Sequence, residues 1–284
     1  EGREEVSWEN RVIGRGLRLH LQREQIKRRL QSVIPKPAAI IKTPRNYYHS
    51  GKFGDIIYAL AAIKSAGGGE LWLGPEQIGT SPAGEAINET GYQMLLPLIQ
   101  SQPYISKVTY VSSHPGNEAV DLNEFRNFWF SEDYRRLSGI HNLCQMHFAI
   151  AGIADEFSET EPWLTVPQTK VSKNIIIHRS DHYHGKFDWR RVVESFGKRC
   201  LFVGTPLELR QFNREFGAVN YLSTPTADVL ASAIAGAAAF VGNNSFPCSI
   251  AAGCGQRIWQ EVWETSPDTI FKRPGRFITG PESF

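Results

Sequence analysis

Strand patterns alternate with helix patterns along most of this chain, and that alternation is its strongest constraint on the fold. In the first half, short apolar runs predict strands and longer runs with helical spacing predict helices. The expected strands are 38–41, 46–49, 70–73 and 108–111, and the expected helices are 56–65, 86–99 and 121–153, the last with a break near Gly139. Parallel strands need such crossovers, so the pattern predicts an α/β fold in which helices cover both faces of a parallel sheet.

The alternation stops and then starts again. Residues 155–173 contain Pro162 and Pro167 without helical spacing, as is typical of a linker. After it, strands are expected at 174–178, 200–203, 220–222 and 239–241, and helices at 188–196, 206–216, 226–237 and 248–254. A chain of 284 residues is long enough for two domains of roughly 100 to 200 residues each. The sequence therefore predicts two doubly wound, Rossmann-like domains, residues 41–165 and 166–284, whose strand ends face each other across a cleft.

Residues 1–40 are expected to form a basic helical extension. Segment 11–45 holds ten basic residues against one acid, Glu24, a local charge of +9 in a chain whose net charge is +2. Such a segment fits a polyanionic partner, either a nucleic acid or an anionic membrane surface. The alternative is a solvated helix whose apolar stripe packs on the rest of the chain.

Composition and cysteine spacing narrow the class of protein. Hydrophobic residues make up 41% and charged residues 21%, an ordinary globular composition, and no apolar run reaches the ~20 residues that cross a bilayer. The four cysteines form no Cys-x-x-Cys pair, and no signal-peptide pattern precedes them. We therefore expect reduced thiols and a cytoplasmic protein. The basic segment adds the expectation that the protein binds peripherally to an anionic membrane or to a nucleic acid. The sequence leaves the oligomeric state open.

The loop after the first strand, residues 50–55, carries the first candidate site. Gly51 and Gly54 permit close backbone approach, and Asp55 stands near the start of a helix, where it either caps the helix or does chemistry. The loop has neither G-x-G-x-x-G nor G-x-x-x-x-G-K-[ST], which disfavours a nicotinamide-dependent oxidoreductase and a P-loop nucleoside triphosphatase.

Three loops of the second half complete the candidate set. Arg179 and Lys186 follow a strand and suit a diphosphate, with solvated surface charges as the alternative. A metal site at Asp181, His182 and His184 is disfavoured, because that spacing supplies too few ligands. The other two loops suit a ribose and a phosphate, respectively. Their residues are Gly204, Thr205 and Glu208 in one, and Gly242, Asn243, Asn244, Ser245 and Phe246 in the other.

Taken in order, these motifs resemble glycosyltransferases of the GT-B fold, nearest to the lipopolysaccharide heptosyltransferase-like family that uses ADP-activated sugars. The resemblance rests on Gly54-Asp-Ile-Ile-Tyr-Ala-Leu-Ala-Ala-Ile63, on Lys186 with Trp189, on Gly204 to Glu208, and on Val241-Gly-Asn-Asn-Ser-Phe-Pro-Cys-Ser-Ile-Ala-Ala252. It covers residues 47–259 and excludes the basic extension. The family's Asp, Gly and His in the last motif are Asn244, Phe246 and Ser249 here, which argues against a heptose donor specifically.

The resemblance implies an inverting, metal-independent transfer of a hexosyl or heptosyl type from a nucleotide-diphosphate sugar, with no other cofactor. Asp55 is the implied general base. The implied acceptor-side residues are His49, Ser50, Gly51, Lys52 and Gly54. The acceptor is either a polyanion such as DNA with hydroxylated bases or a lipid-linked glycan. The aromatic residues Phe125, Trp129, Phe130 and Tyr134 suit base stacking or, alternatively, core packing. The rival function is a non-catalytic GT-B-like binding or assembly module.

Overall fold

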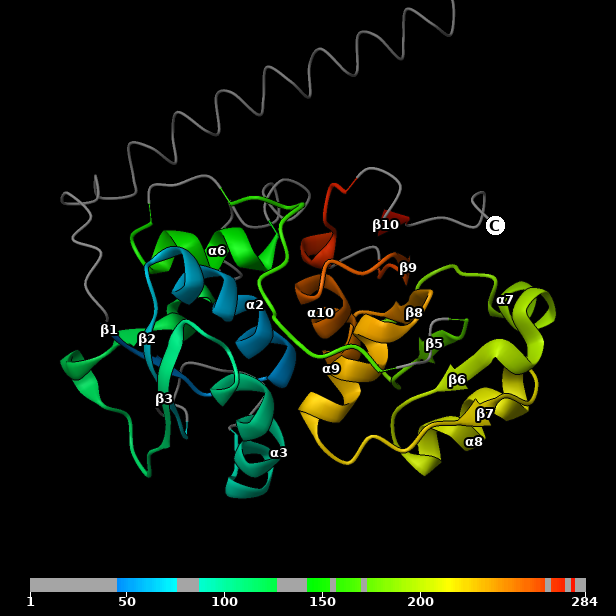
Figure 1. The fold of residues 1–284 in the computed structure, drawn as a ribbon, viewed down its shortest axis with the longest axis horizontal. Helices are drawn as coiled ribbons and strands as arrows, with labels where there is room; N and C mark the ends of the chain where they lie inside the picture. The colour runs from blue at the N-terminus through cyan, green and yellow to red at the C-terminus, as the bar shows by residue number, and fades with distance from the viewer. Residues whose placement is uncertain are drawn as a thin grey trace, which may run out of the picture. The chain divides into compact units, whose positions relative to one another are not determined.

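The computed structural model describes residues 45–75, 87–126, 142–153, 157–169, 173–263, 267–273 and 277–278. Residues 41–284 form one compact unit, and both sheets belong to it (Figure 1). The predicted basic extension, residues 1–40, lies outside the described residues, as do Trp129, Phe130 and Tyr134. The predicted domain boundary between residues 165 and 166 stays a prediction.

The first sheet is parallel, and its strand order is β3-β2-β1-β4. Its strands are β1 (Arg45–His49), β2 (Gly69–Leu73), β3 (Ile105–Tyr110) and β4 (Val120–Asp121). The helices of this half are α2 (Phe53–Ser65), α3 (Glu89–Gln100) and α6 (Leu143–Ile150), with short 3-10 turns η1 (Gly116–Glu118) and η2 (Leu122–Arg126). Strands β1, β2 and β3 follow each other in one direction, and β4 returns to the far side of β1.

The second sheet is also parallel and repeats this winding, in the order β10-β9-β8-β5-β6-β7. Its strands are β5 (Ile175–His178), β6 (Cys200–Phe202), β7 (Asn220–Tyr221), β8 (Ala239–Asn243), β9 (Ile258–Glu261) and β10 (Phe277–Ile278). Its helices are α7 (Trp189–Phe196), α8 (Pro206–Phe216), α9 (Ala227–Gly236) and α10 (Phe246–Gly253), with 3-10 turns η3 (Gly197–Arg199) and η4 (Pro267–Thr269). The prediction of an α/β fold with two doubly wound sheets is confirmed.

The two halves pack directly on one another. Helix α2 contacts α10, and α3 contacts α9 (Figure 1, blue against orange for the first pair). Every residue of α2 from Asp55 to Ile63 is buried, because the helix packs against both α6 and α10. This explains why the sequence of α2 is continuously apolar rather than amphipathic.

The connecting segment adds to that packing. Residues 157–169 contain no helix or strand, as expected of a linker, yet Trp163 and Leu164 are buried. The Trp163 indole donates a hydrogen bond of 2.8 Å to the Ile57 carbonyl in α2, and its backbone N–H donates to Gly253 in α10. Trp163 therefore binds both halves together at a fixed point.

One predicted helix begins too early. Residues 121–126 are not α-helical: Asp121 ends β4, and residues 122–126 form the turn η2. The Asp121 carboxylate accepts from the Asn123 backbone N–H at 2.9 Å, a local bond that competes with helix formation. Strand β4 has only two residues, too few to give a periodic pattern. Phe125 is fully buried, so it packs in the core and is not an exposed stacking surface.

The second half differs from prediction at one loop and beyond residue 254. Gly242 and Asn243 belong to β8 rather than to a loop, and α10 begins two residues earlier than expected, at Phe246. Strands β9 and β10 were not predicted. All four cysteines are free thiols, as predicted, and three of them are buried. Within the described ranges, no helix is long and apolar enough to cross a membrane.

Candidate functional site

Each sheet has one point where the winding reverses, and the polar clusters of the chain gather there. In the first sheet the reversal lies between β1 and β4, and in the second between β5 and β8. Crevices at the carboxyl ends of such strands are where open α/β sheets bind ligands. The loops that leave these four strands begin at Ser50, Leu122, Arg179 and Asn244. Three of the four are close to loops singled out from the sequence, and the loop after β4 is new.

Asp55 lies in the first turn of α2, three residues after the N-cap Lys52. Its side chain is 13% exposed and forms an ion pair with Arg126 at 3.6 Å. Burial raises the pKa of this carboxyl from 3.8 to about 6, against the lowering effect of Arg126; the nearby Asp268 raises it further, and a backbone hydrogen bond at Lys52 lowers it. Asp55 therefore changes charge close to neutral pH.

Arg126 lies in the turn η2 after β4 and binds the loop that precedes Asp55. Its guanidinium donates to the Gly51 carbonyl and, at 2.8 Å, to the Asn123 side-chain oxygen. That same oxygen accepts from the backbone and hydroxyl of Ser50, at 3.0 and 2.8 Å. Ser50, Asn123 and Arg126 are all buried, so this network is shielded from water. The loop that presents Asp55 is thereby fixed by two buried partners, the neutral Asn123 and the cationic Arg126.

A layer of buried rings lies under the same loop. His49 and His147 are fully buried, 5.6 Å apart between ring centroids, and both contact Phe125. Burial lowers the pKa of His49 well below its usual range and that of His147 to about 3. Both rings are therefore neutral at physiological pH. His49 Nδ1 accepts from the Gly51 backbone N–H at 3.1 Å, so His49 supports the loop from inside.

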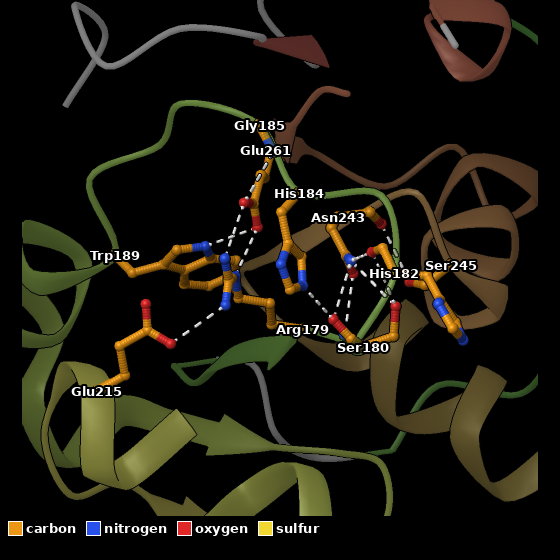
Figure 2. A network of polar contacts seen from close by, with 10 residues as sticks. All are labelled: Arg179, Ser180, His182, His184, Gly185, Trp189, Glu215, Asn243, Ser245 and Glu261. Atoms are coloured by element: carbon orange, nitrogen blue, oxygen red, sulfur yellow. Dashed lines mark hydrogen bonds and ion pairs between the residues drawn. The ribbon is translucent and has the colours of Figure 1, made fainter. Parts of the chain in front are cut away.

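In the second half, Asn243 connects the loops after β5 and β8 (Figure 2). This buried side chain accepts from the Ser180 backbone N–H at 3.1 Å. Its amide nitrogen donates to the Ser180 hydroxyl at 3.0 Å and to the His182 carbonyl. His184 closes the turn by a contact of 2.6 Å with the Ser180 carbonyl. Asn243 therefore shapes the 180–184 loop instead of facing outward.

Arg179 is engaged by a buried carboxylate, Glu261 at the end of β9 (Figure 2). Its guanidinium donates to the two Glu261 oxygens at 2.9 and 3.3 Å, a bidentate geometry, and reaches Glu215 at 3.5 Å. Glu261 also accepts from the Trp189 indole at 2.9 Å and from the Gly185 backbone at 3.0 Å. Lys186, by contrast, is exposed on the same loop.

The third candidate loop, at the start of α8, is a capping box. The Thr205 side chain caps the helix at the Glu208 backbone N–H, and the Glu208 carboxylate accepts from the Thr205 backbone at 2.7 Å and hydroxyl at 2.8 Å. Gly204 has φ +130°, and an added Cβ would lie 2.8 Å from the Glu208 carboxylate and 2.9 Å from His178. Glu208 is thus held at the mouth of this loop by Thr205.

The first turns of α2 and α10 meet. A Cβ added at Gly54 would lie 3.7 Å from the Ser249 hydroxyl and 3.9 Å from the Phe246 Cα, and the Phe53 and Phe246 rings lie 5.5 Å apart. Ser245 is the N-cap of α10, and its hydroxyl donates to the Asn243 carbonyl at 3.0 Å. Two helix N-termini, each with a partial positive charge, therefore converge beside Asp55.

Comparison with solved structures places this geometry in a known fold. The glycosyl transferase family 9 protein from Veillonella parvula superposes with a TM-score of 0.53 at 10% identity, over 80% of this chain and 82% of that one. The chain has a GT-B glycosyltransferase fold. The ADP-heptose lipopolysaccharide heptosyltransferase II of E. coli also matches, with a TM-score of 0.49 at 11% identity, over 77% of this chain and 84% of that one. No family model and no curated protein matches the sequence.

Within this fold, several predicted site residues come together and others prove internal. Gly54, next to Asp55 in the first turn of α2, lies against Phe246 in the first turn of α10. His49, Ser50 and Asn243 are buried and support loops. Asn244 accepts from the Gln260 side chain. In the described part of the chain, no three side chains of His, Cys, Asp or Glu are grouped as a metal site would require.

Sequence reasoning missed the residues that orient these loops. Asn123 and Arg126 stand in a stretch interpreted as helix, and Glu261 lies beyond the last motif of the resemblance. A local signal existed for the first pair, because Asp-x-Asn is a common turn former. Nothing in the sequence alone pairs Arg126 with Asp55 or Glu261 with Arg179, because each pair spans more than 70 residues.

Proposed function

We propose that this protein transfers a sugar from a nucleotide-diphosphate sugar to an acceptor hydroxyl. The observation that carries the proposal is Asp55: a buried carboxyl with a pKa raised to about 6, beside the meeting helix N-termini of a glycosyltransferase fold. A base works best when its pKa lies near the operating pH, and Asp55 meets that condition.

In the proposed reaction, ionised Asp55 accepts the proton of the acceptor hydroxyl. The acceptor oxygen attacks the anomeric carbon in one displacement, the bond from that carbon to the diphosphate oxygen breaks, and the nucleoside diphosphate leaves with the bonding electrons. The anomeric configuration inverts. Arg126, at 3.6 Å, favours the ionised form of Asp55 and orients it before the proton is taken.

The donor is proposed to lie along the second half. Lys186 is exposed and free to approach a phosphate, and the N-terminus of α10 behind Ser245 adds its partial positive charge to hold the leaving diphosphate. Glu208 and Gly204 are proposed to hold the ribose. Arg179 already has a bidentate partner in Glu261, so its proposed effect on the diphosphate is to hold the Lys186 loop in place. No metal or further cofactor enters the proposal.

The acceptor side is proposed to use Lys52 and Gly54 directly. His49, Ser50 and Gly51 are buried, so their proposed role is to shape the loop that carries Lys52 and Asp55. A polyanion such as modified DNA, or a lipid-linked glycan, are the acceptor classes that the basic segment 11–45 favours.

One observation favours the second candidate, a non-catalytic binding module. Phe246 replaces the glycine of the family motif, and its ring packs against Phe53 where the two helix N-termini meet. A phenylalanine there restricts the backbone approach that a diphosphate would use. The two candidates differ in whether a nucleotide sugar binds at all.

A thermal-shift panel of nucleoside diphosphates and nucleotide sugars tests this first, because a ligand specific to the folded state raises its stability by RT ln(1 + [L]/Kd). We expect one nucleotide class to raise the melting temperature of the wild type and of Asp55→Asn, but not of Glu208→Ala. Asp55→Asn should then bind that donor without transferring its sugar. Stabilisation by no nucleotide at millimolar concentration would favour the binding module, and normal transfer by Asp55→Asn would refute the assigned base.

A further inference from the structure

Two exposed aromatic side chains from different loops pack together at the mouth of the second half. Tyr183 lies in the loop after β5 and Trp263 lies just after β9; each is 37% exposed. Their ring centroids are 5.2 Å apart and the ring planes are inclined by 46°. We call this pair the aromatic shelf. The other large hydrophobic side chains exposed in the described ranges, Leu207, Tyr221 and Val229, lie on α8, β7 and α9.

The backbone around the shelf is tightly held. Tyr183 has φ +61°, the left-handed region, and no other non-glycine residue in the described part of the chain has a positive φ. Such a conformation persists only when the surroundings enforce it, and it is a recognised mark of functional positions. The enforcement is visible on both sides: Asn243 binds the His182 carbonyl, and the Gly185 backbone N–H donates to the buried Glu261.

The loop also rests against the segment that supplies Trp263. A Cβ added at Gly185 would lie 1.8 Å from the Val262 carbonyl oxygen, so the two backbones touch where only glycine fits. The position of the Tyr183 ring over Trp263 is therefore set by buried polar bonds and by close backbone packing, rather than by the rings alone.

The shelf borders the acceptor-side loop. The Lys52 ammonium lies 6.0 Å from the Tyr183 ring centroid, within the range of a cation–π contact. Lys52 is the N-cap of α2, and Asp55 lies in the first turn of the same helix. Tyr183 therefore places an aromatic face next to the loop that carries the proposed base, although it belongs to the second half of the chain.

We propose that the aromatic shelf binds one sugar ring of the acceptor, whose hydroxyl is thereby brought to Asp55; this rests on the proposed transferase function. Exposed aromatic faces bury well against the C–H face of a sugar ring, while the ring's hydroxyls stay available to polar groups such as the Lys52 ammonium. A nucleobase is flat and stacks on one ring face, whereas two rings inclined by 46° form an angled surface that a puckered sugar ring follows better than a flat base. The shelf thus favours a glycan acceptor over a nucleic acid.

Saturation-transfer NMR on the full chain tests the shelf without requiring any transfer. The probes are methyl glycosides of common hexoses at millimolar concentration. Tyr183→Asn removes the ring but tolerates the left-handed backbone, Trp263→Ala removes the other ring, and Tyr183→Phe keeps the shelf. Tyr221→Asn is the matched control at an exposed tyrosine on β7, and circular dichroism checks that each variant is folded.

We expect at least one glycoside to receive saturation in wild type, Tyr183→Phe and Tyr221→Asn, and its affinity to fall about fivefold to tenfold in the two shelf variants. Equal binding in all variants, or no glycoside binding, would overturn the proposal. The proposal would also be overturned if a short single-stranded oligodeoxynucleotide bound in a shelf-dependent manner and no glycoside did. Displacement of the glycoside by a nucleotide sugar, but not by its nucleoside diphosphate, would assign the shelf to the donor sugar instead. Glycoside binding in a protein that binds no nucleotide would refute the transferase while leaving the shelf a sugar site.

Discussion

Replacing Asp55 with Asn should make the protein more stable at neutral pH, although it removes the proposed base. Burial raises the pKa of this carboxyl from 3.8 to about 6, so the folded state holds its proton more tightly than the unfolded chain does. Between these two values the folded state binds more protons, and its stability therefore falls as the pH rises. The difference of about 2 pH units, at 1.36 kcal/mol for each, corresponds to about 3 kcal/mol above pH 6.

Asparagine has the same shape and does not ionise, so Asp55→Asn avoids this cost. The lost attraction to Arg126 is already included in the pKa, because that ion pair lowers it against burial. The variant and the wild type should unfold with a nearly constant difference in free energy below about pH 4. That difference should then shift in favour of the variant by about 3 kcal/mol up to pH 7 and stay there.

Urea unfolding followed by circular dichroism at pH 4, 5, 6, 7 and 8 measures the shift directly, with ionic strength held constant. Glu194→Gln, which neutralises an exposed carboxylate on α7, is the control and should show less than about 1 kcal/mol of change across the series. A difference between Asp55→Asn and wild type that is the same at every pH would refute a raised pKa. A difference that moves against the variant as the pH rises would show that Arg126 outweighs burial.

Three further perturbations follow from the same contacts. Glu261→Gln removes the buried carboxylate that pairs with Arg179, whose side chain is 16% exposed, and leaves only the Glu215 contact; it should cost about 3 kcal/mol of unfolding free energy. Glu215→Gln, at a side chain 57% exposed, should cost less than about 1 kcal/mol, and equal losses in urea unfolding would contradict the buried network. Arg126→Met removes a cation that lowers the pKa of Asp55, so the acid limb of the pH profile of kcat/KM should move above about 6, and an unmoved limb would exclude their coupling. Gly185→Ala places a Cβ against a backbone carbonyl oxygen at 1.8 Å and should lower stability by about 1 to 3 kcal/mol in thermal unfolding; an unchanged melting temperature would show that the two backbones are free to separate.

Local residue patterns were enough to predict most of the secondary structure. The apolar run that becomes α2 and the buried strand β5 lie close to their expected bounds, because their periodicity comes from burial on a sheet. The expected helix 206–216 has the bounds of α8, and the structure shows that a capping box of Thr205 and Glu208 fixes its start. Short elements were predicted wrongly because they lack a periodic pattern. Strand β4 has only two residues, and a hydrogen bond from the Asn123 backbone to the Asp121 side chain stands where a helix was expected.

The candidate site also has a part that the sequence predicts and a part that it does not. Its position at the ends of β1, β5 and β8 and the residues Asp55, Lys186 and Ser245 could be proposed from the sequence, because parallel strands bring their carboxyl ends to one edge. The sequence could not, however, distinguish the residues that face a ligand from the residues that hold a loop in place. His49 and Asn243 are polar residues, like Lys52, and only packing shows that they are internal.

The sequence by itself thus determined the α/β alternation, the expectation of two sheets and the edge at which chemistry is placed, since these follow from the local spacing of apolar residues and from the rule that parallel strands end at one edge. Only the tertiary structure decided the charge state of Asp55, the partner of Arg179 and the meeting of Tyr183 with Lys52 and Trp263. Burial and long-range pairing produce these properties, and both are set by which strands the winding makes neighbours.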